Sequence, residues 1–306
     1  MELFVFYITY PIIWLVSRLP MWVLYLLSDF LSFLLGTVFG YRKEVVIENL
    51  QYVFPEKSEK EITVIVKNFY KHLTDISVES LKSFSISEKE ILKRYVYKNP
   101  ELINKYTEEG RSVALIGAHL ANWEWSFSIP LVLNTTVFGA YNKLRNETFE
   151  KVLRENREKF GAVGMRTSDT VEKIMSNFKK NIKGVYILLS DQSPLVEKTF
   201  YWNEFFGIKV PIHTGAEMIS KKFNLVVINY VTKKIKRGYY ETTFELITET
   251  PNDYKNYDIT DKYIRLTEEN IKEQPAYYLW SHKRFKHQHR YEEWLNSRNV
   301  KTQTKQ

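Results

Sequence analysis

"RSVALIGAHLANWEW", residues 111–125, joins a run of small and branched apolar residues to a segment that holds His119, Glu124 and two tryptophans. The apolar run is typical of a strand that is buried on both faces of a parallel sheet. In open α/β sheets, binding and catalytic sites lie beyond the carboxyl ends of the strands. The stretch therefore predicts an α/β fold with His119 at the functional edge of the sheet.

The remainder of the chain alternates between strand and helix patterns. This alternation is typical of an α/β domain with a mixed, largely parallel central sheet flanked by helices. Further strands are expected at residues 135–141, 184–191, 225–232 and 239–247, the last two about a basic turn. Helices are expected at residues 57–84, 147–161, 170–180, 214–224 and 259–274. If the strands pair as neighbours, three polar clusters converge at strand ends: His119–Glu124, Tyr141–Arg145 and Asp191–Gln192.

The composition is that of one large globular domain rather than a multi-span membrane protein. The 306 residues contain no linker rich in proline, serine or glycine, and the mean hydropathy is −0.34. No cysteine is present, which excludes disulfides, thiolate nucleophiles and thiolate metal sites and fits a reducing compartment. The net charge of +8 favours a polyanionic partner, either nucleic acid or anionic lipid.

Two apolar runs at the N-terminus favour lipid as that partner. Residues 3–16 carry no charge, and residues 21–39 form a second run about long enough to cross a bilayer as a helix. Asp29 at mid-span would cost about 3 kcal/mol on insertion scales, and Pro11 argues against one straight helix. The runs favour a membrane anchor, and they leave open two helices in or on one leaflet or a helical hairpin in a soluble core.

The charges beside these runs predict the side of the membrane. Lysine and arginine flank only the C-terminal side of both runs, which places the rest of the chain in the cytoplasm. No basic residue precedes the first run, so a cleaved signal peptide is not expected. We expect an N-terminal anchor at residues 1–43, a catalytic domain at 44–296 and a polar, disordered tail at 297–306.

His119 and Glu124 suggest acid–base chemistry. On one helix, residues five apart would point about 140° away from each other, at 3.6 residues per turn. If His119 lies on a loop and a helix begins near Asn122, a good N-cap residue, Glu124 could reach back to the histidine. A carboxylate on one ring nitrogen fixes the tautomer and makes the other nitrogen a better base for a hydroxyl proton. The pair therefore predicts direct acyl transfer to an alcohol, or a related hydrolysis.

Other catalytic motifs are absent from the sequence. It contains no GxSxG, HExxH, P-loop or GxGxxG motif. The segment "HKRFKHQH" holds His282, His287 and His289, but no acidic residue lies among them. A basic, phosphate-facing surface is therefore favoured there over a metal site, and neither a metal nor a cofactor is expected.

Several ordered motifs resemble those of the bacterial lipid A secondary acyltransferases, within the wider glycerolipid and lysophospholipid acyltransferase group. "HLANWEW" is similar to the H-x4-E/D box of that group. Six further segments follow the family's order along most of the chain: "RKEVVIENLQYVFPE" at 42–56, "YNKLRN" at 141–146, "DQ" at 191–192, "FFG" at 205–207, "PIHTGAE" at 211–217 and "YYLWSHKRFK" at 277–286.

This resemblance implies roles for individual residues. His119 would be the general base toward a hydroxyl on a lipid-linked acyl chain, and Glu124 would orient and polarise it. Arg145 would meet a phosphate or the thioester carbonyl, and Asp191 and Gln192 would shape the pocket floor. Trp280, His282, Lys283 and Arg284 would face a phosphorylated head group. The remaining substrate-binding candidates are Asn122, Trp123, Tyr141 and Lys143.

The resemblance also implies partners and a location. The donor would be an acyl thioester on acyl carrier protein or on coenzyme A, and the acceptor a phosphorylated glycolipid, a lipid A precursor. The basic residues of 281–306 suit an acidic carrier protein or the anionic inner leaflet. The expected location is the inner membrane, with the catalytic domain on the cytoplasmic side. Two alternatives stay open: the same chemistry on a lysophospholipid or amino-acid lipid, or a non-catalytic membrane-binding protein. Nucleic acid is not an expected partner.

Overall fold

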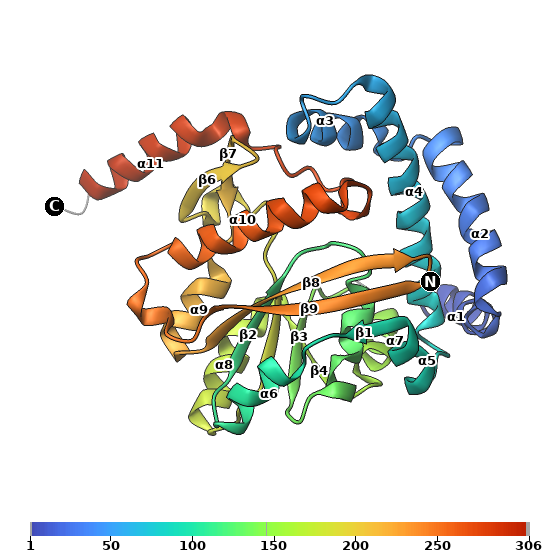
Figure 1. Cartoon of the computed structure of the whole chain (residues 1–306), viewed down its shortest axis with the longest axis horizontal. Coiled ribbons are helices and arrows are strands. Elements are labelled where there is room, and N and C mark those ends of the chain that lie inside the picture. The colour runs from blue at the N-terminus through green and yellow to red at the C-terminus, as the bar shows by residue number, and fades with distance from the viewer. Residues whose placement is uncertain (1, 145, 304–306) are drawn as a thin grey trace.

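A seven-stranded sheet forms the centre of the chain in a computed structural model (Figure 1), which describes residues 2–144 and 146–303. The strand order is β1-β9-β8-β2-β5-β3-β4, and the described neighbours pair in parallel except for the antiparallel hairpin β8–β9. These strands are β1 (Tyr95–Tyr97), β2 (Val113–Gly117), β3 (Val137–Tyr141), β4 (Ala162–Arg166), β5 (Val185–Leu189), β8 (Val226–Lys236) and β9 (Tyr239–Thr248).

The predicted fold class, a mixed and largely parallel sheet flanked by helices, is confirmed. The expected strands at 135–141, 184–191, 225–232 and 239–247 correspond to β3, β5, β8 and β9. The structure adds strands that the patterns did not predict: β1, β4 and the separate two-stranded hairpin of β6 (Tyr201–Phe205) and β7 (Ile208–Ile212). β1 has only three residues, and β4, β6 and β7 mix apolar residues with glycine, proline or polar residues, so none of them forms a continuous apolar run like that of β2 or β5.

Helices surround this sheet in the order that the sequence predicts. The expected helices at 57–84, 147–161, 170–180, 214–224 and 259–274 are α4 (Glu59–Lys82), α7 (Glu147–Glu158), α8 (Thr170–Lys179), α9 (Gly215–Phe223) and α10 (Asp258–Glu273). The other helices are α1 (Glu2–Arg18), α2 (Met21–Phe33), α3 (Lys43–Val53), α5 (Glu88–Arg94), α6 (Glu101–Glu108) and α11 (Tyr291–Gln303).

Strand β2 shows why the sheet has two buried faces. Its alternate residues Ala114 and Ile116 pack into one apolar cluster, which includes side chains of α8, α9 and α10. Val113 and Leu115 pack into a second cluster on the opposite face, with side chains of α5 and α6. All five residues of the strand are buried, and each large apolar side chain contributes roughly 1.5–3 kcal/mol when it leaves water. A continuous apolar run is therefore required here.

Helix α4 connects the N-terminal helices to the sheet (Figure 1). Its first turn is fixed by a capping box, in which Ser58 and Glu61 each accept a hydrogen bond from the other's backbone N–H. One stripe of the helix buries polar side chains, among them Asp75 and Glu79. Buried carboxylates must be paired or hydrogen-bonded, so this stripe has to receive donors from the elements packed against it.

Helix α2 supplies some of those donors. Ser28 donates to Asp75 at 2.8 Å, and Tyr25 donates to Glu79 at 2.9 Å. Asp29, the charge that is unfavourable in a spanning helix, accepts two hydrogen bonds from Arg237 at 2.7 and 3.0 Å. The helix continues through a π-helical turn at Leu34–Val38, and residues 21–38 are long and apolar enough to cross a membrane, although only 11% of them are buried.

Helices α1 and α11 lie on opposite sides of the molecule (Figure 1). At the C-terminal end, α11 includes residues 297–303, so helix crosses the boundary expected at residue 296. Trp294 on this helix stacks against Tyr291 and donates its indole N–H to the carbonyl of Thr199 at 3.2 Å.

Candidate active site

His119 lies two residues beyond the end of β2, on a loop that is held by its backbone. The segment 277–280 runs alongside this loop: the Ala121 N–H donates to the Tyr277 carbonyl at 2.9 Å, and the Leu279 N–H to the His119 carbonyl at 3.1 Å. The last residue of the strand, Gly117, has no side chain, and a Cβ atom at this position would collide with the ring of Tyr230. The loop is therefore positioned by close packing before His119 is reached.

The acidic partner of His119 is Asp191. The Nδ1 atom of His119 lies 2.8 Å from Oδ1 of Asp191. Strands β2 and β5 pair with Gly117 opposite Leu189, so the residues two positions beyond each strand come to lie side by side. An ionised carboxylate only accepts hydrogen bonds, so Nδ1 carries the proton and Nε2 is the nitrogen available to act as a base.

Burial and charge oppose each other at this pair. Burial disfavours the charged imidazolium, but the charge and hydrogen bond of Asp191, with a smaller effect of Glu124, outweigh it and raise the pKa of His119. Asp191 is 1% exposed, and burial acts to raise its pKa, yet the neighbouring histidine brings that pKa below the usual value. The Asp191 carboxylate therefore remains ionised and makes His119 a stronger base.

Glu124 has a different partner from the one the sequence suggested. Its two carboxylate oxygens lie 3.2 and 3.3 Å from Nη2 of Arg157 on α7. Asp191 makes the hydrogen bond to the histidine ring that was expected of Glu124, and Glu124 acts on His119 through its charge. Nothing in the sequence singles out Arg157, which is one of several charged residues on the amphipathic helix α7.

A 3-10 helix, Glu124–Val132, follows His119 in place of an α-helix, and its N-cap is Trp123 rather than the expected Asn122. Asn122 lies one residue earlier, and its side-chain oxygen accepts from the Trp125 N–H at 3.0 Å. Its amide group donates to Glu79 at 2.7 Å. The Trp123 ring meets the His119 ring edge-on, with centroids 5.4 Å apart, and so covers one side of the imidazole.

Of the other two polar clusters, Asp191–Gln192 lies at the site, whereas the described residues of Tyr141–Arg145 have other partners. Gln192 lies beside the histidine, with its side-chain nitrogen 3.4 Å from Nε2. Tyr141 instead donates its hydroxyl to Glu150 at 2.7 Å, and the exposed side chain of Lys143 lies 3.4 Å from Glu147. Arg145 falls outside the described residues.

In the segment 277–286, two of the residues expected to face a head group are buried rather than exposed on the surface. Trp280 is fully buried and donates its indole N–H to the Pro275 carbonyl at 2.5 Å. Arg284 is 1% exposed and lies over the ring of Phe205, so in this structure neither residue is exposed to a head group. Lys283 is exposed to solvent.

His282 is also unsuited to carrying a positive charge. Burial, together with the charges of Arg284 and Lys286, lowers the pKa of His282 to about 4. The ring is therefore neutral at physiological pH, and its Nε2 atom accepts a hydrogen bond from the Ser193 N–H at 3.0 Å. Of the four predicted head-group residues, Lys283 alone is both exposed and charged in the part of the chain that the structure describes.

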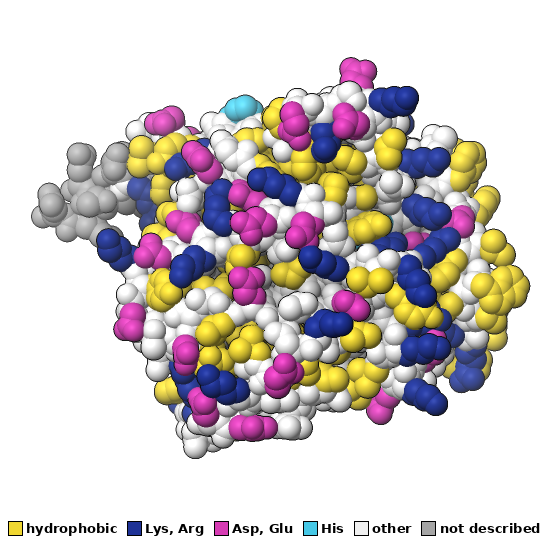
Figure 2. All heavy atoms as spheres, viewed as in Figure 1, with side chains coloured by type: hydrophobic (Ala, Val, Ile, Leu, Met, Phe, Trp, Pro, Cys, Tyr) yellow, Lys and Arg dark blue, Asp and Glu magenta, His cyan; other side chains and the backbone are white. Residues whose placement is uncertain are grey.

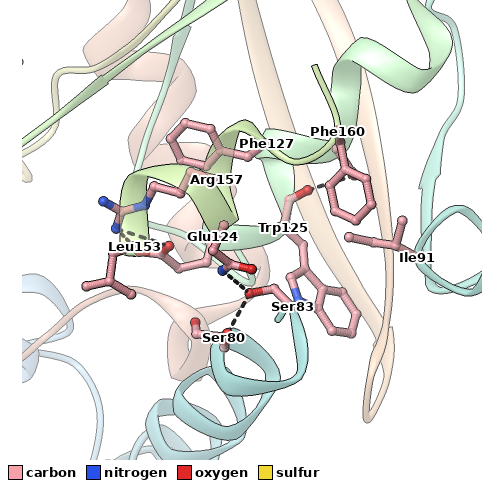
Figure 3. A pocket seen from close by; sticks show the side chains of 11 residues that line it. Ser80, Ser83, Ile91, Glu124, Trp125, Phe127, Leu153, Arg157 and Phe160 are labelled. Carbon is pink, nitrogen blue, oxygen red and sulfur yellow. Dashed lines mark hydrogen bonds and ion pairs between the residues drawn. The ribbon is translucent and has the colours of Figure 1, made fainter. Parts of the chain in front are cut away.

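A narrow cavity of about 40 Å³ opens beside the Glu124–Arg157 ion pair (Figure 3). Its walls come from α4, α5, α7 and the 3-10 helix. Apolar side chains make up much of the lining, together with Ser80 of α4 and Ser83 at the end of that helix. The lining residues are Ser80, Ser83, Ile91, Glu124, Trp125, Phe127, Ser128, Leu153, Asn156, Arg157 and Phe160.

No group of three or more histidine, cysteine or acidic side chains gathers as metal ligands in residues 2–144 and 146–303. The chemistry that the described site offers is therefore that of a histidine–carboxylate pair at a strand edge. Such a pair can remove a proton from a hydroxyl and return it to a leaving group.

Fold and site together define an α/β protein whose histidine–carboxylate pair lies at the carboxyl edge of a mixed sheet. The model of one protein family, described as "Bacterial lipid A biosynthesis acyltransferase", matches residues 1–287. The chain belongs to this family, and membership implies an acyltransferase that uses an acyl donor and a lipid acceptor. A comparison with curated proteins finds no match to the chain.

Proposed function

We propose that the protein transfers a fatty acyl chain from the thioester of acyl carrier protein to a hydroxyl of a lipid A precursor. The observation that carries this proposal is the His119–Asp191 pair, 2.8 Å apart, in a chain whose family is that of lipid A acyltransferases. Without a cysteine or a GxSxG serine in the sequence, direct transfer to the acceptor hydroxyl is the simplest use of such a base.

The reaction then needs a single proton carrier. Nε2 of His119 takes the proton from the acceptor hydroxyl as its oxygen attacks the thioester carbonyl and the C–O bond forms. Asp191 stabilises the resulting imidazolium through the hydrogen bond at Nδ1. The tetrahedral intermediate collapses with cleavage of the C–S bond, and the imidazolium returns its proton to the departing thiolate. The products are an ester and a free thiol.

We assign stabilisation of the oxyanion of this intermediate to Arg157. It lines the cavity beside Glu124, is paired with that carboxylate and lies close to the ring of Phe127. We assign to Glu124 the role of holding this guanidinium in place. Preorganised donors of this kind contribute about 10²–10³ in rate. Arg154, one turn earlier on α7 and 3.8 Å from Glu158, provides a matched control.

The cavity beyond Glu124 is the proposed entrance for the acyl chain. Its apolar walls suit methylene groups, but a volume of about 40 Å³ holds only a few waters, at about 10–15 Å³ of such volume per water. Side chains lining it must therefore move when a chain enters. Ser80 on α4 and Ser83, which caps the end of that helix, lie on one wall, so larger residues there should shorten the chain that is accepted (Figure 3).

The N-terminal helices provide the proposed attachment to the membrane. The outer face of α2 exposes large apolar side chains, with Trp22 67%, Leu26 61% and Phe30 59% exposed. Hydrophobic and basic side chains lie together at this edge of the molecule (Figure 2). The inner face of α2 is occupied by hydrogen bonds to α4, which supports two helices lying in one leaflet rather than a separate span.

Lipid and donor specificity can be tested with the purified full chain. Acyl carrier protein thioesters and acyl-CoA are compared as donors, and a phosphorylated lipid A precursor, a lysophospholipid and an amino-acid lipid as acceptors, with products identified by mass spectrometry. We expect one added acyl mass on the lipid A precursor and none with His119→Ala. Acylation of another lipid alone would leave the chemistry standing and change the acceptor, whereas full activity of His119→Ala would overturn the mechanism.

The role proposed for Arg157 is tested by comparing substitutions at two arginines of α7. Arg157→Gln is expected to lower kcat by about 10²-fold, as for other lost oxyanion donors. Arg154→Gln, which leaves the Glu124 pair intact, should lower kcat by less than about threefold. Equal losses in the two variants would contradict the role proposed for Arg157.

A further inference from the structure

Glu79 on α4 is a buried carboxylate that joins three elements. Its exposed fraction is 0%, and within the described residues it forms no salt bridge, although the charge of Lys234 acts on it from a greater distance. Its Oε1 atom accepts from the hydroxyl of Tyr25 on α2 at 2.9 Å. Its Oε2 atom accepts from the hydroxyl of Tyr240 on β9 and from the amide of Asn122, each at 2.7 Å. A buried carboxylate without a direct ion-pair partner is costly, and these three donors offset that cost.

The segment that follows His119 is bound to Glu79 by two hydrogen bonds. Asn122 donates to the Glu79 side chain, and the Trp125 indole N–H donates to the Glu79 backbone carbonyl at 3.0 Å. Asn122 also accepts from the Trp125 backbone N–H, so both contacts belong to one rigid turn. Ala121, just before it, has φ of 51°, which is unfavourable for a residue with a side chain and needs external support.

The Oε1 atom of Glu79 contacts α2, the helix proposed to bind the membrane, through Tyr25. Tyr25 lies on the inner surface of α2, between the exposed Trp22 and Leu26 in sequence. The hydrogen-bonded chain Tyr25–Glu79–Asn122 therefore runs from the proposed membrane-binding helix to the turn that follows His119. Neither end of this chain touches the His119–Asp191 pair directly.

We propose that Glu79 is a positioning residue that links the seating of α2 on α4 to the alignment of the His119 loop. The inference rests on the proposed function, because it assigns Glu79 a role in acyl transfer by His119. The segment 277–280 holds one side of the loop through backbone hydrogen bonds, and Glu79 holds the other. When Tyr25 leaves its place, or the Glu79 side chain is lost, the loop loses the hydrogen bond to Asn122 that supports it on this side.

The kinetic test compares Glu79→Leu with Glu79→Gln in the full chain, assayed in vesicles of anionic lipid with acyl carrier protein thioester and lipid A precursor. Leucine removes both side-chain acceptors and leaves only the backbone carbonyl that accepts from Trp125. We therefore expect kcat to fall about 10–100-fold while KM stays within about twofold, since misplacement of a catalytic group by about 1 Å costs up to 10² in rate. Glutamine keeps an oxygen that can accept from Asn122, so it should retain kcat within about fivefold. A structural role alone would move the folded fraction rather than kcat per active site.

The link to the membrane helix is tested by Tyr25→Phe against Ser28→Ala. Both remove a hydrogen bond between α2 and α4, but only Tyr25 contacts Glu79, whereas Ser28 contacts Thr74 and Asp75. Tyr25→Phe is expected to lower kcat about 3–10-fold, and Ser28→Ala less than twofold. Equal effects of the two variants would show that α2 packing as a whole matters and would overturn the specific chain through Glu79.

Hydrogen exchange provides a readout that does not depend on activity. Peptides that cover residues 118–128 should exchange about tenfold faster in Glu79→Leu and Tyr25→Phe than in the wild type, and unchanged in Ser28→Ala. Unaltered exchange together with wild-type kcat in Glu79→Leu would overturn the proposal, and Tyr25→Phe gives the same test if the leucine variant does not fold. A wild-type chain with no acyl transfer would refute the proposed function, while the exchange data would still decide whether Glu79 holds the loop.

Discussion

Replacing Asp191 by asparagine separates the two acids that lie near His119. Asparagine keeps the shape of the side chain but removes the charge that faces Nδ1 at 2.8 Å. At that distance the attraction between unit charges is about 6 kcal/mol for an effective dielectric constant of about 20. Burial offsets part of it, which leaves about 3 kcal/mol, the upper range for a hydrogen bond to a charged group. At 1.36 kcal/mol per tenfold, kcat/KM should fall about 150-fold.

The pH dependence of kcat/KM provides a second, independent test of the role of Asp191. The pKa of His119 is raised above its ordinary value, so the base is lost as the pH falls through that raised pKa. Without the Asp191 charge, the pKa of His119 should fall, and the acidic limb of kcat/KM should move to lower pH while the plateau drops. Glu124→Gln should move this limb less, because Glu124 contributes less to the shift than Asp191 does.

The assay is release of free thiol from the acyl carrier protein thioester, followed between about pH 5 and pH 9 with the full chain. Asp253→Asn, an exposed acid near the end of β9, is the control for loss of one negative charge. A wild-type plateau and limb in Asp191→Asn, with both altered in Glu124→Gln, would refute the reasoning. The partner of His119 during catalysis would then be Glu124.

Three further changes test the packing, the membrane contact and the buried acid. Gly117→Ala should lower the free energy of unfolding by about 1–3 kcal/mol in denaturant melts, because its Cβ atom would meet the Tyr230 ring; an unchanged midpoint would show that the ring can move away. The double variant Trp22→Ser and Leu26→Ser should reduce flotation with anionic vesicles by at least about tenfold, because it removes apolar area from the lipid-facing side of α2; unchanged flotation would place the contact elsewhere. Burial raises the pKa of Glu79 from 4.5 to about 7, so between these pH values the wild type should lose about 3 kcal/mol of stability relative to Glu79→Gln as the pH rises; parallel stability curves would contradict it.

The sequence was sufficient for strands β2, β3, β5, β8 and β9, for the five helices expected around them and for the position of the histidine. The short apolar run at 113–117 favours a strand buried on both faces, because every residue of such a strand leaves water. A histidine directly after such a strand lies at the edge where α/β proteins build their sites. The apolar runs at the N-terminus favoured a membrane anchor and left open two helices or a hairpin, and the structure has two helices, α1 and α2. The ordered motifs indicated the family that residues 1–287 match.

Tertiary structure alone decided which acid meets His119. Glu124 is five residues away along the chain, but a tight turn directs it toward Arg157. Asp191 is 72 residues away and reaches the ring because β2 and β5 pair with Gly117 opposite Leu189. Chain spacing constrains only neighbours on one element, whereas sheet register sets which strand ends face each other. For the same reason the sequence could not show that Glu79 lies beneath the loop, since that contact depends on how α4 crosses the edge of the sheet.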